Sequence, residues 1–200
     1  MNVRLKKNLH FTMGVWHADQ LVMNSYMVDL YLHTNTADSA EQNIAFERLK
    51  YFVYGELDSS IMLDQQAVPK CQQLMSAGLR VTTMPHELVD QLVGIMLYYK
   101  LNAIMEQRIV ITDVEISSNL GDHIVYMHNQ DEHSQDLDRP AWWTTADLAH
   151  CDHDLIESSN IVNINRVRSW RELELDWPVV HATESGNIVS FSDLKRNDTE

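Results

Sequence analysis

Two segments near the N-terminus alternate apolar and polar residues with the period of a β-strand. In residues 8–16 every second residue is apolar: Leu9, Phe11, Met13 and Val15. In residues 25–33 the same holds for Tyr26, Val28, Leu30 and Leu32. Such alternation is typical of strands with one buried face. Residues 18–20 between them can form a turn, so the sequence predicts a long antiparallel hairpin.

The period then changes to that of an amphipathic helix. Apolar residues within positions 41–57 recur at spacings of three and four: Ala45, Leu49, Phe52, Val53 and Leu57. After a predicted loop, a second helix is expected from Pro85, because proline is tolerated in a first helical turn. Its apolar face would consist of Leu88, Leu92, Val93, Met96 and Leu97.

Strand character returns in residues 108–117 and 123–128, with a turn at Gly121 and Asp122. Strict alternation in the first of these strands places Ile109, Ile111, Asp113 and Glu115 on one face, and Val110, Thr112, Val114 and Ile116 on the other. The order strand, strand, helix, helix, strand, strand predicts an α+β fold, with two helices packed on one face of a four-stranded antiparallel sheet.

The composition of the chain changes after residue 128. An acidic connector at 129–139 leads to segments that carry four tryptophans: Trp142, Trp143, Trp170 and Trp177. We therefore predict a domain of residues 1–128 and a C-terminal extension of residues 129–200. We expect this extension to pack on the domain or a neighbouring subunit, while contact with a protein partner is the alternative.

Charge and composition narrow the classes of function. The chain has 15 Lys and Arg against 29 Asp and Glu, a net charge of −14, so binding to nucleic acid or an anionic membrane surface is not expected. The best membrane candidate, residues 88–101, is interrupted by Asp90 and Gly94 and is shorter than the roughly 20 residues of a span. The N-terminus resembles no signal segment, and two cysteines, Cys71 and Cys151, make no disulfide framework. A cytoplasmic location is expected.

One cluster near residue 150 has residue types that bind metals: His150, Cys151 and His153. Zinc sites usually supply two well-spaced pairs of ligands, and a second pair is missing here. The plainer interpretation is a polar helix start capped by Asp147 or Asp152, and we predict no metal site.

Short motifs across residues 8–128 resemble the family of 6-pyruvoyl-tetrahydropterin synthase and 6-carboxy-tetrahydropterin synthase. They lie at residues 11–17, 45–50, 57–59, 84–87 and 111–116, in the same order as in that family. The resemblance implies the tunnelling fold (T-fold), in which several copies close a barrel and ligands bind between subunits. It therefore implies a homo-oligomer.

The residues that perform the chemistry of that family are mostly replaced. The family holds catalytic zinc with three histidines; His17 corresponds to one, and Val22 and Asn24 replace the other two. The family's cysteine is absent, and in its Asp-His pair Asp58 remains while Ser59 replaces the histidine. The resemblance thus implies no zinc and a lost synthase reaction. Asp58, Ser59 and His17 stay weak catalytic candidates, and a structural histidine is the preferred interpretation of His17.

One ligand-binding residue of the family is kept. The resemblance implies that Glu115 accepts hydrogen bonds from the amino and ring N–H groups of a pterin- or purine-like molecule, since two parallel donors match a carboxylate. The alternative is a solvent-facing strand residue.

Three functions remain open at this point. The first is a pseudoenzyme that binds such a ligand at a subunit interface. The second is a zinc-independent T-fold enzyme of pterin or deazapurine metabolism, of the lyase or cyclohydrolase type. The third is a structural or regulatory oligomer that binds no small molecule.

Overall fold

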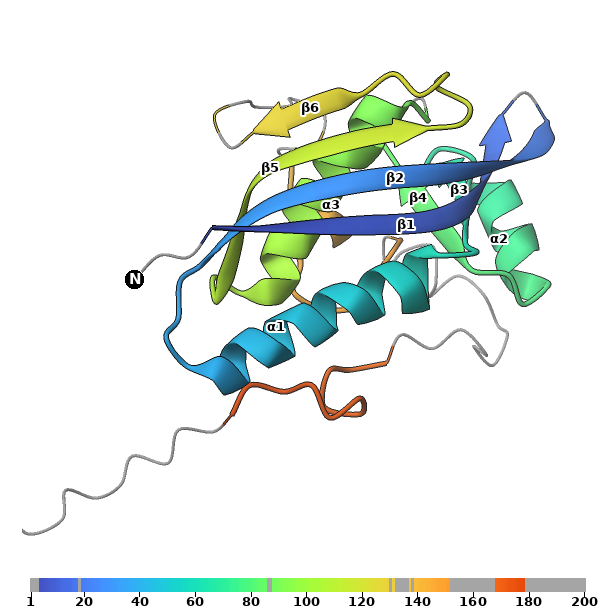
Figure 1. Cartoon of the computed structure of the whole chain (residues 1–200). Helices are drawn as coiled ribbons and strands as arrows, with labels where there is room; N and C mark the ends of the chain where they lie inside the picture. Colours follow the sequence, from blue (N-terminus) through green and yellow to red (C-terminus); the bar gives the residue numbers. More distant parts are fainter. Residues whose placement is uncertain are drawn as a thin grey trace, which may run out of the picture.

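The computed structural model describes residues 4–17, 19–85, 88–129, 131, 137, 139–151 and 168–178. A curled six-stranded sheet carries α1 and α3 on one face, as Figure 1 shows. The strands are β1 (Arg4–His17), β2 (Gln20–Thr34), β3 (Ile61–Asp64), β4 (Val81–Met84), β5 (Ile109–Ser118) and β6 (Tyr126–Asn129). The helices are α1 (Ser39–Tyr51), the π-helix η1 (Phe52–Leu57), α2 (Val68–Ser76), α3 (Asp90–Met105) and the 3-10 helix η2 (Trp142–Thr144). No helix of the described part is long and apolar enough to span a membrane.

The predicted hairpin is present as β1 and β2, which pair antiparallel along their whole lengths. The strand order is β4-β3-β1-β2-β5-β6, and the pairs β1–β3 and β3–β4 are parallel. The predicted four-stranded antiparallel sheet is therefore corrected to a mixed sheet of six strands. Strands β3 and β4 have four residues each and are almost fully buried, so neither shows the alternation from which a strand is predicted.

The helical region also differs from the prediction. The predicted loop between the two helices contains α2 as well as β3 and β4. Helix α3 begins at Asp90, and Pro85 precedes it as a bend. Helix α2 packs on the other side of β3 from α1 and α3. Met62 of β3 belongs to the main core, whereas its neighbours Ile61 and Leu63 point to the opposite face and form a small second core with α2.

A β-bulge interrupts the alternation of β5. Tyr31 pairs with Asp113 and Leu32 pairs with Ile111, so Thr112 is an extra residue opposite β2. An extra residue reverses the alternation beyond it. The buried apolar residues of β5 accordingly change parity along the strand: Ile109, Ile111, Val114 and Ile116.

The predicted faces of β5 are thus wrong in one respect. Asp113 and Glu115 do share a face, but Ile109 and Ile111 lie on the opposite one, with the main core. Sequence periodicity could not show this, because both sides of the bulge alternate regularly. The bulge lets β5 bury apolar residues along its length and still present Glu115 on the face away from α1 and α3.

The C-terminal segments pack on the helices of the domain. Trp142 and Trp143 are buried in the main core, and Trp170 packs edge-on against Tyr51 of α1 at 6.5 Å between ring centroids. Arg48 of α1 donates from Nε to the carbonyl of Leu175 at 2.8 Å. The expected helix around residues 147–157 is absent from the described part, where residues 145–151 form bends without regular secondary structure; residues 152–157 lie outside the described residues.

Candidate functional site

The face of β1, β2 and β5 that points away from α1 and α3, here called the open face, carries polar side chains. The register of the strands brings Asn8 opposite Asp29, and Asp29 opposite Glu115. One step along the same strands, His10 lies opposite Met27 and close to the level of Ser117. A hollow of about 320 Å³ on this face is lined by Asn8, His10, Met27, Val28, Asp29, Glu115, Ile116, Ser117 and Val125.

Two carboxylates meet across β2 and β5 in this hollow, and their surroundings differ. Asp29 forms an ion pair with Lys6 at 2.7 Å and accepts a hydrogen bond from the Asn8 amide. The Lys6 ammonium outweighs partial burial and lowers the pKa of Asp29. The negative charge of Asp29 is therefore already balanced by Lys6 within the sheet.

Glu115 is half-buried and has a single hydrogen-bond partner among the described residues. The Tyr31 hydroxyl donates to Oε1 at 3.0 Å, and the Tyr31 ring lies 5.1 Å from the Lys6 ammonium. An ionised carboxylate has about four acceptor positions on its two oxygens. Glu115 thus keeps acceptor capacity toward the hollow, which suits a ligand that brings N–H donors.

A second hollow of about 470 Å³ continues along the open face toward the start of β1. It is lined by Arg4, Leu5, Tyr31, Leu32, His33, Thr112 and Asp113. Tyr31 lines this hollow, and its hydroxyl donates to Glu115 of the first one, although the two linings have no residue in common.

The weak catalytic candidates Asp58 and Ser59 hold the backbone of β1. Asp58 Oδ1 accepts the Thr12 N–H at 2.8 Å, and the Ser59 N–H donates to the Thr12 carbonyl at 2.7 Å. Ser59 adopts a left-handed conformation with φ of 63°. Both residues therefore connect η1 to β1, and they lie on no wall of either hollow.

The positions that correspond to the zinc histidines of the resembled family hold His17, Val22 and Asn24. His17 is the last residue of β1 and pairs with Gln20, and its side chain lies outside the described residues. Val22 has no donor atom. Asn24 is buried, and its amide oxygen accepts the Leu120 N–H at 3.0 Å, which holds the turn after β5. Nowhere in the described part do three or more His, Cys, Asp or Glu side chains gather as a metal site would require.

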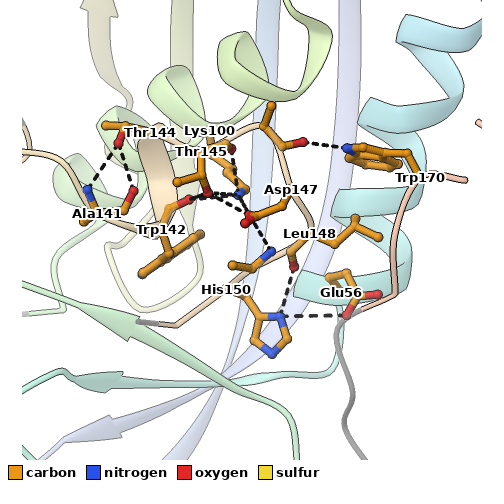
Figure 2. Close-up of polar contacts among 12 residues, drawn as sticks. Glu56, Lys100, Ala141, Trp142, Thr144, Thr145, Asp147, Leu148, His150 and Trp170 are labelled. Carbon is orange, nitrogen blue, oxygen red and sulfur yellow. Dashed lines mark hydrogen bonds and ion pairs between the residues drawn. The ribbon is translucent and has the colours of Figure 1, made fainter. Parts of the chain in front are cut away.

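A cluster of polar contacts around the buried Lys100 joins the extension to the helices (Figure 2). Lys100 of α3 has no exposed surface. Its ammonium donates to the carbonyls of Trp142 at 2.8 Å and Thr145 at 3.0 Å, and it lies 3.3 Å from Asp147 Oδ1. Burial lowers the pKa of Lys100 to about 8. No role was predicted for Lys100 from the sequence. A lysine within the apolar stretch 88–101 was nevertheless a signal, because lysine is almost never fully buried without partners.

His150 lies below this cluster, as Figure 2 shows. Its Nδ1 is 3.8 Å from Glu56 Oε2 and 3.4 Å from the Leu148 carbonyl. Burial lowers the pKa of His150 to about 4, so the imidazole is neutral near pH 7 and the contact with Glu56 is no ion pair there. Arg80, 4.0 Å from Glu56, supplies the compensating charge. Of the suspected cluster, His150 and Cys151 are buried, while Asp152 and His153 lie outside the described residues.

Comparisons with known proteins give structural likeness only. No protein-family model and no curated protein matches the sequence. An uncharacterized protein of Wolinella succinogenes is similar to 65% of this chain over 99% of its own, with a TM-score of 0.46 and 11% identity. The 6-pyruvoyl tetrahydropterin synthases of Plasmodium vivax and Plasmodium falciparum have TM-scores of 0.43 and 0.41, with 11% and 12% identity. They cover 65% and 64% of this chain, each over 98% of its own length.

Proposed function

We propose that this chain binds a pterin-, purine- or deazapurine-like molecule through Glu115, at an interface between subunits, and lacks zinc-dependent synthase activity. The observation that carries the proposal is the state of Glu115: a half-buried carboxylate, held by one neutral hydroxyl at 3.0 Å, that lines a hollow of about 320 Å³. Molecules of this class present a ring N–H beside an exocyclic amine, and two such donors match the two oxygens of one carboxylate.

The residues around the hollow support a flat, partly apolar ligand. Met27 and Val125 supply apolar surface, and Ser117 and His10 supply groups that can exchange hydrogen bonds. The open side of the hollow would have to be closed by another molecule, which agrees with a site between subunits. A homo-oligomer is accordingly part of the proposal.

The loss of zinc chemistry is proposed from the residues at the positions of the family's zinc ligands. A catalytic zinc ion needs three protein donors and an open position. Val22 offers no donor, and the oxygen of Asn24 is already bonded to the backbone of Leu120. For the zinc-independent enzyme, Asp58 and Ser59 are the named candidates, and both are bonded to the backbone of β1. No specific observation favours the enzyme or the purely structural oligomer over the ligand binder.

A binding experiment with one variant and one matched control tests the proposal. Pterins and guanine derivatives are screened by thermal shift, and any hit is measured by calorimetry with the wild type, Glu115→Gln and Asp113→Asn. Asp113 lies two residues away on the same face of β5 but outside the Glu115 hollow. Ligand at 100 times its Kd stabilises the folded state by about 2.7 kcal/mol, which a thermal shift detects.

Loss of hydrogen bonds to a charged acceptor costs about 1.5–3 kcal/mol, so Glu115→Gln should weaken binding roughly 10- to 100-fold. Asp113→Asn should bind like the wild type. The proposal fails if no member of these classes shifts the melting temperature, or if Glu115→Gln binds as tightly as Asp113→Asn.

A further inference from the structure

The C-terminal extension covers the edge strand β4 through two hydrogen bonds to one residue. The Thr83 N–H donates to the His150 carbonyl at 3.1 Å, and the Trp142 indole N–H donates to the Thr83 carbonyl at 3.0 Å. In a strand, the N–H and C=O of one residue point to the same side, so both outward groups of Thr83 are occupied. The two contacts come from near the opposite ends of residues 139–151, and these two ends are held in different ways.

The end at Trp142 is held by charges that persist in mild acid. The buried Lys100 ammonium donates to the Trp142 and Thr145 carbonyls and lies 3.3 Å from Asp147 Oδ1. The pKa of Lys100 is about 8, so the ammonium stays charged below neutral pH. Burial tends to raise the pKa of Asp147, but the hydrogen bond from the Thr145 hydroxyl and the charge of Lys100 outweigh it and lower that pKa. Acidification to about pH 5 therefore leaves this anchor intact.

The other end, residues 148–151, is here called the β4 cap, and all four of its residues are buried. Its one titratable group in contact with a carboxylate is His150, whose Nδ1 lies 3.8 Å from Glu56 of η1 (Figure 2). Arg80, just before β4, and Lys100 of α3 act on the imidazole with their positive charges. Tyr51 and Arg168 interact with Glu56 in turn.

A proton on His150 is poorly compensated while the β4 cap is in place. Burial raises the pKa of Glu56, so on acidification this carboxylate loses its charge earlier than an exposed one does. The imidazolium would then be buried near Arg80 and Lys100, which carry the same sign of charge. An uncompensated buried charge is costly, whereas an imidazolium in water is not. Displacement of the β4 cap removes this cost.

We infer that mild acid releases the β4 cap from the edge of the sheet while the Lys100 anchor holds the preceding part of the extension. The cap moves about the backbone next to Asp147, and its release frees the outward N–H of Thr83. An edge strand with unpaired N–H groups can accept another extended segment, so acid makes β4 available for pairing. This device involves neither Glu115 nor its hollow and does not depend on the proposed ligand.

Hydrogen exchange of single amides in the full chain, followed by NMR, tests the inference. The exchange rate of the Thr83 amide, divided by its intrinsic rate at each pH, gives the equilibrium constant for opening of the cap. A pKa of 6.5 in the open state against about 4 in the closed state increases opening by up to about 20-fold between pH 7 and 5. The Thr144 amide, which donates to the Ala141 carbonyl at 2.9 Å in the anchored part, should keep its protection. The amides that join β1 to β2 should keep theirs as well.

Two variants change the pH dependence in opposite directions. Protonation of Glu56 favours the closed state, so Glu56→Gln should make the increase in Thr83 opening steeper than in the wild type. His150→Gln should abolish the increase, and the control His10→Gln, on the exposed side of β1, should retain it. If a variant does not fold, the two buried cysteines of the wild type decide. Cys151 of the cap, but not Cys71 of α2, should react faster at pH 5 than at pH 7 with a pyridyl disulfide, relative to a small thiol.

Unchanged protection of Thr83 in the wild type between pH 7 and 5 would overturn the inference. An equal loss of protection at Thr83, Thr144 and the β1–β2 amides would also overturn it, because the whole fold would then be opening. An increase that persists in His150→Gln, or that disappears in Glu56→Gln, would show that His150 is not the trigger.

Discussion

Acid should destabilise this protein through His150. Burial lowers the pKa of this imidazole from 6.5 to about 4. In the unfolded chain it takes up a proton near pH 6.5, whereas in the folded chain it stays neutral down to about pH 4. The unfolded state therefore binds more protons in this range, and stability falls as the pH decreases from 6.5 to 4. At about 1.4 kcal/mol per pKa unit, the loss by pH 4 amounts to ~3 kcal/mol.

Protonation of Glu56 has the opposite effect on stability, so its contribution has to be distinguished from that of His150. Burial raises the pKa of Glu56, so its protonation favours the folded state as the pH decreases. The variant His150→Gln keeps Glu56 and removes the imidazole. His10→Gln, on the exposed side of β1, is the control for losing a histidine as such.

Urea unfolding at pH 7, 5.5 and 4.5 measures the effect. Between pH 7 and 4.5, the wild type and His10→Gln should lose about 2–3 kcal/mol more unfolding free energy than His150→Gln does. Equal losses in all three proteins would mean that the folded state accommodates the protonated imidazole, and the argument from burial would be refuted.

Two further changes probe the packing of the domain and of its extension. Gly121→Ala should destabilise the fold by about 1–3 kcal/mol in urea unfolding, because a Cβ would lie 2.2 Å from Asp90 Oδ2; an unchanged midpoint would show that Asp90 can move aside at little cost. Arg48→Met removes a guanidinium that lies 3.9 Å from the Trp177 ring and bonds the Leu175 carbonyl, so limited proteolysis should cut residues 168–178 faster than in the wild type. Equal cleavage rates would show that the tryptophans hold this segment without Arg48.

Periodicity predicted the parts of the fold that are long and have one buried face. The hairpin is the clearest case, since Leu9 and Val28 lie in the core as their alternation indicates. It could not predict β3 or β4, because a strand of four buried residues has no alternation to show. The bulge at Thr112 was equally invisible, because it depends on the pairing with β2.

For the candidate site, the sequence named Glu115 but none of its surroundings. Tyr31, which holds its carboxylate, is 84 positions away along the chain and meets it only through strand pairing. The assignment of Asp58 to acid–base work illustrates the opposite limit. A motif identifies a residue type at a position, while its hydrogen-bond partner, here the Thr12 N–H, becomes known only in the fold.

Because β5 contains a bulge, the number of its residues has more influence on which side chains face the core than the identity of most of them. Val114 and Ile116 could be exchanged for other apolar residues of similar size at modest cost. Deletion of Thr112 would remove the bulge and leave the other residues of β5 on their present faces, because Asp113 would follow Ile111 directly. An insertion or deletion of one residue between Asp113 and Glu115 has no such compensation and, with the pairing before it kept, would turn Glu115 toward α3. Relatives of this chain should therefore lack the residue at Thr112 more readily than any other residue of β5.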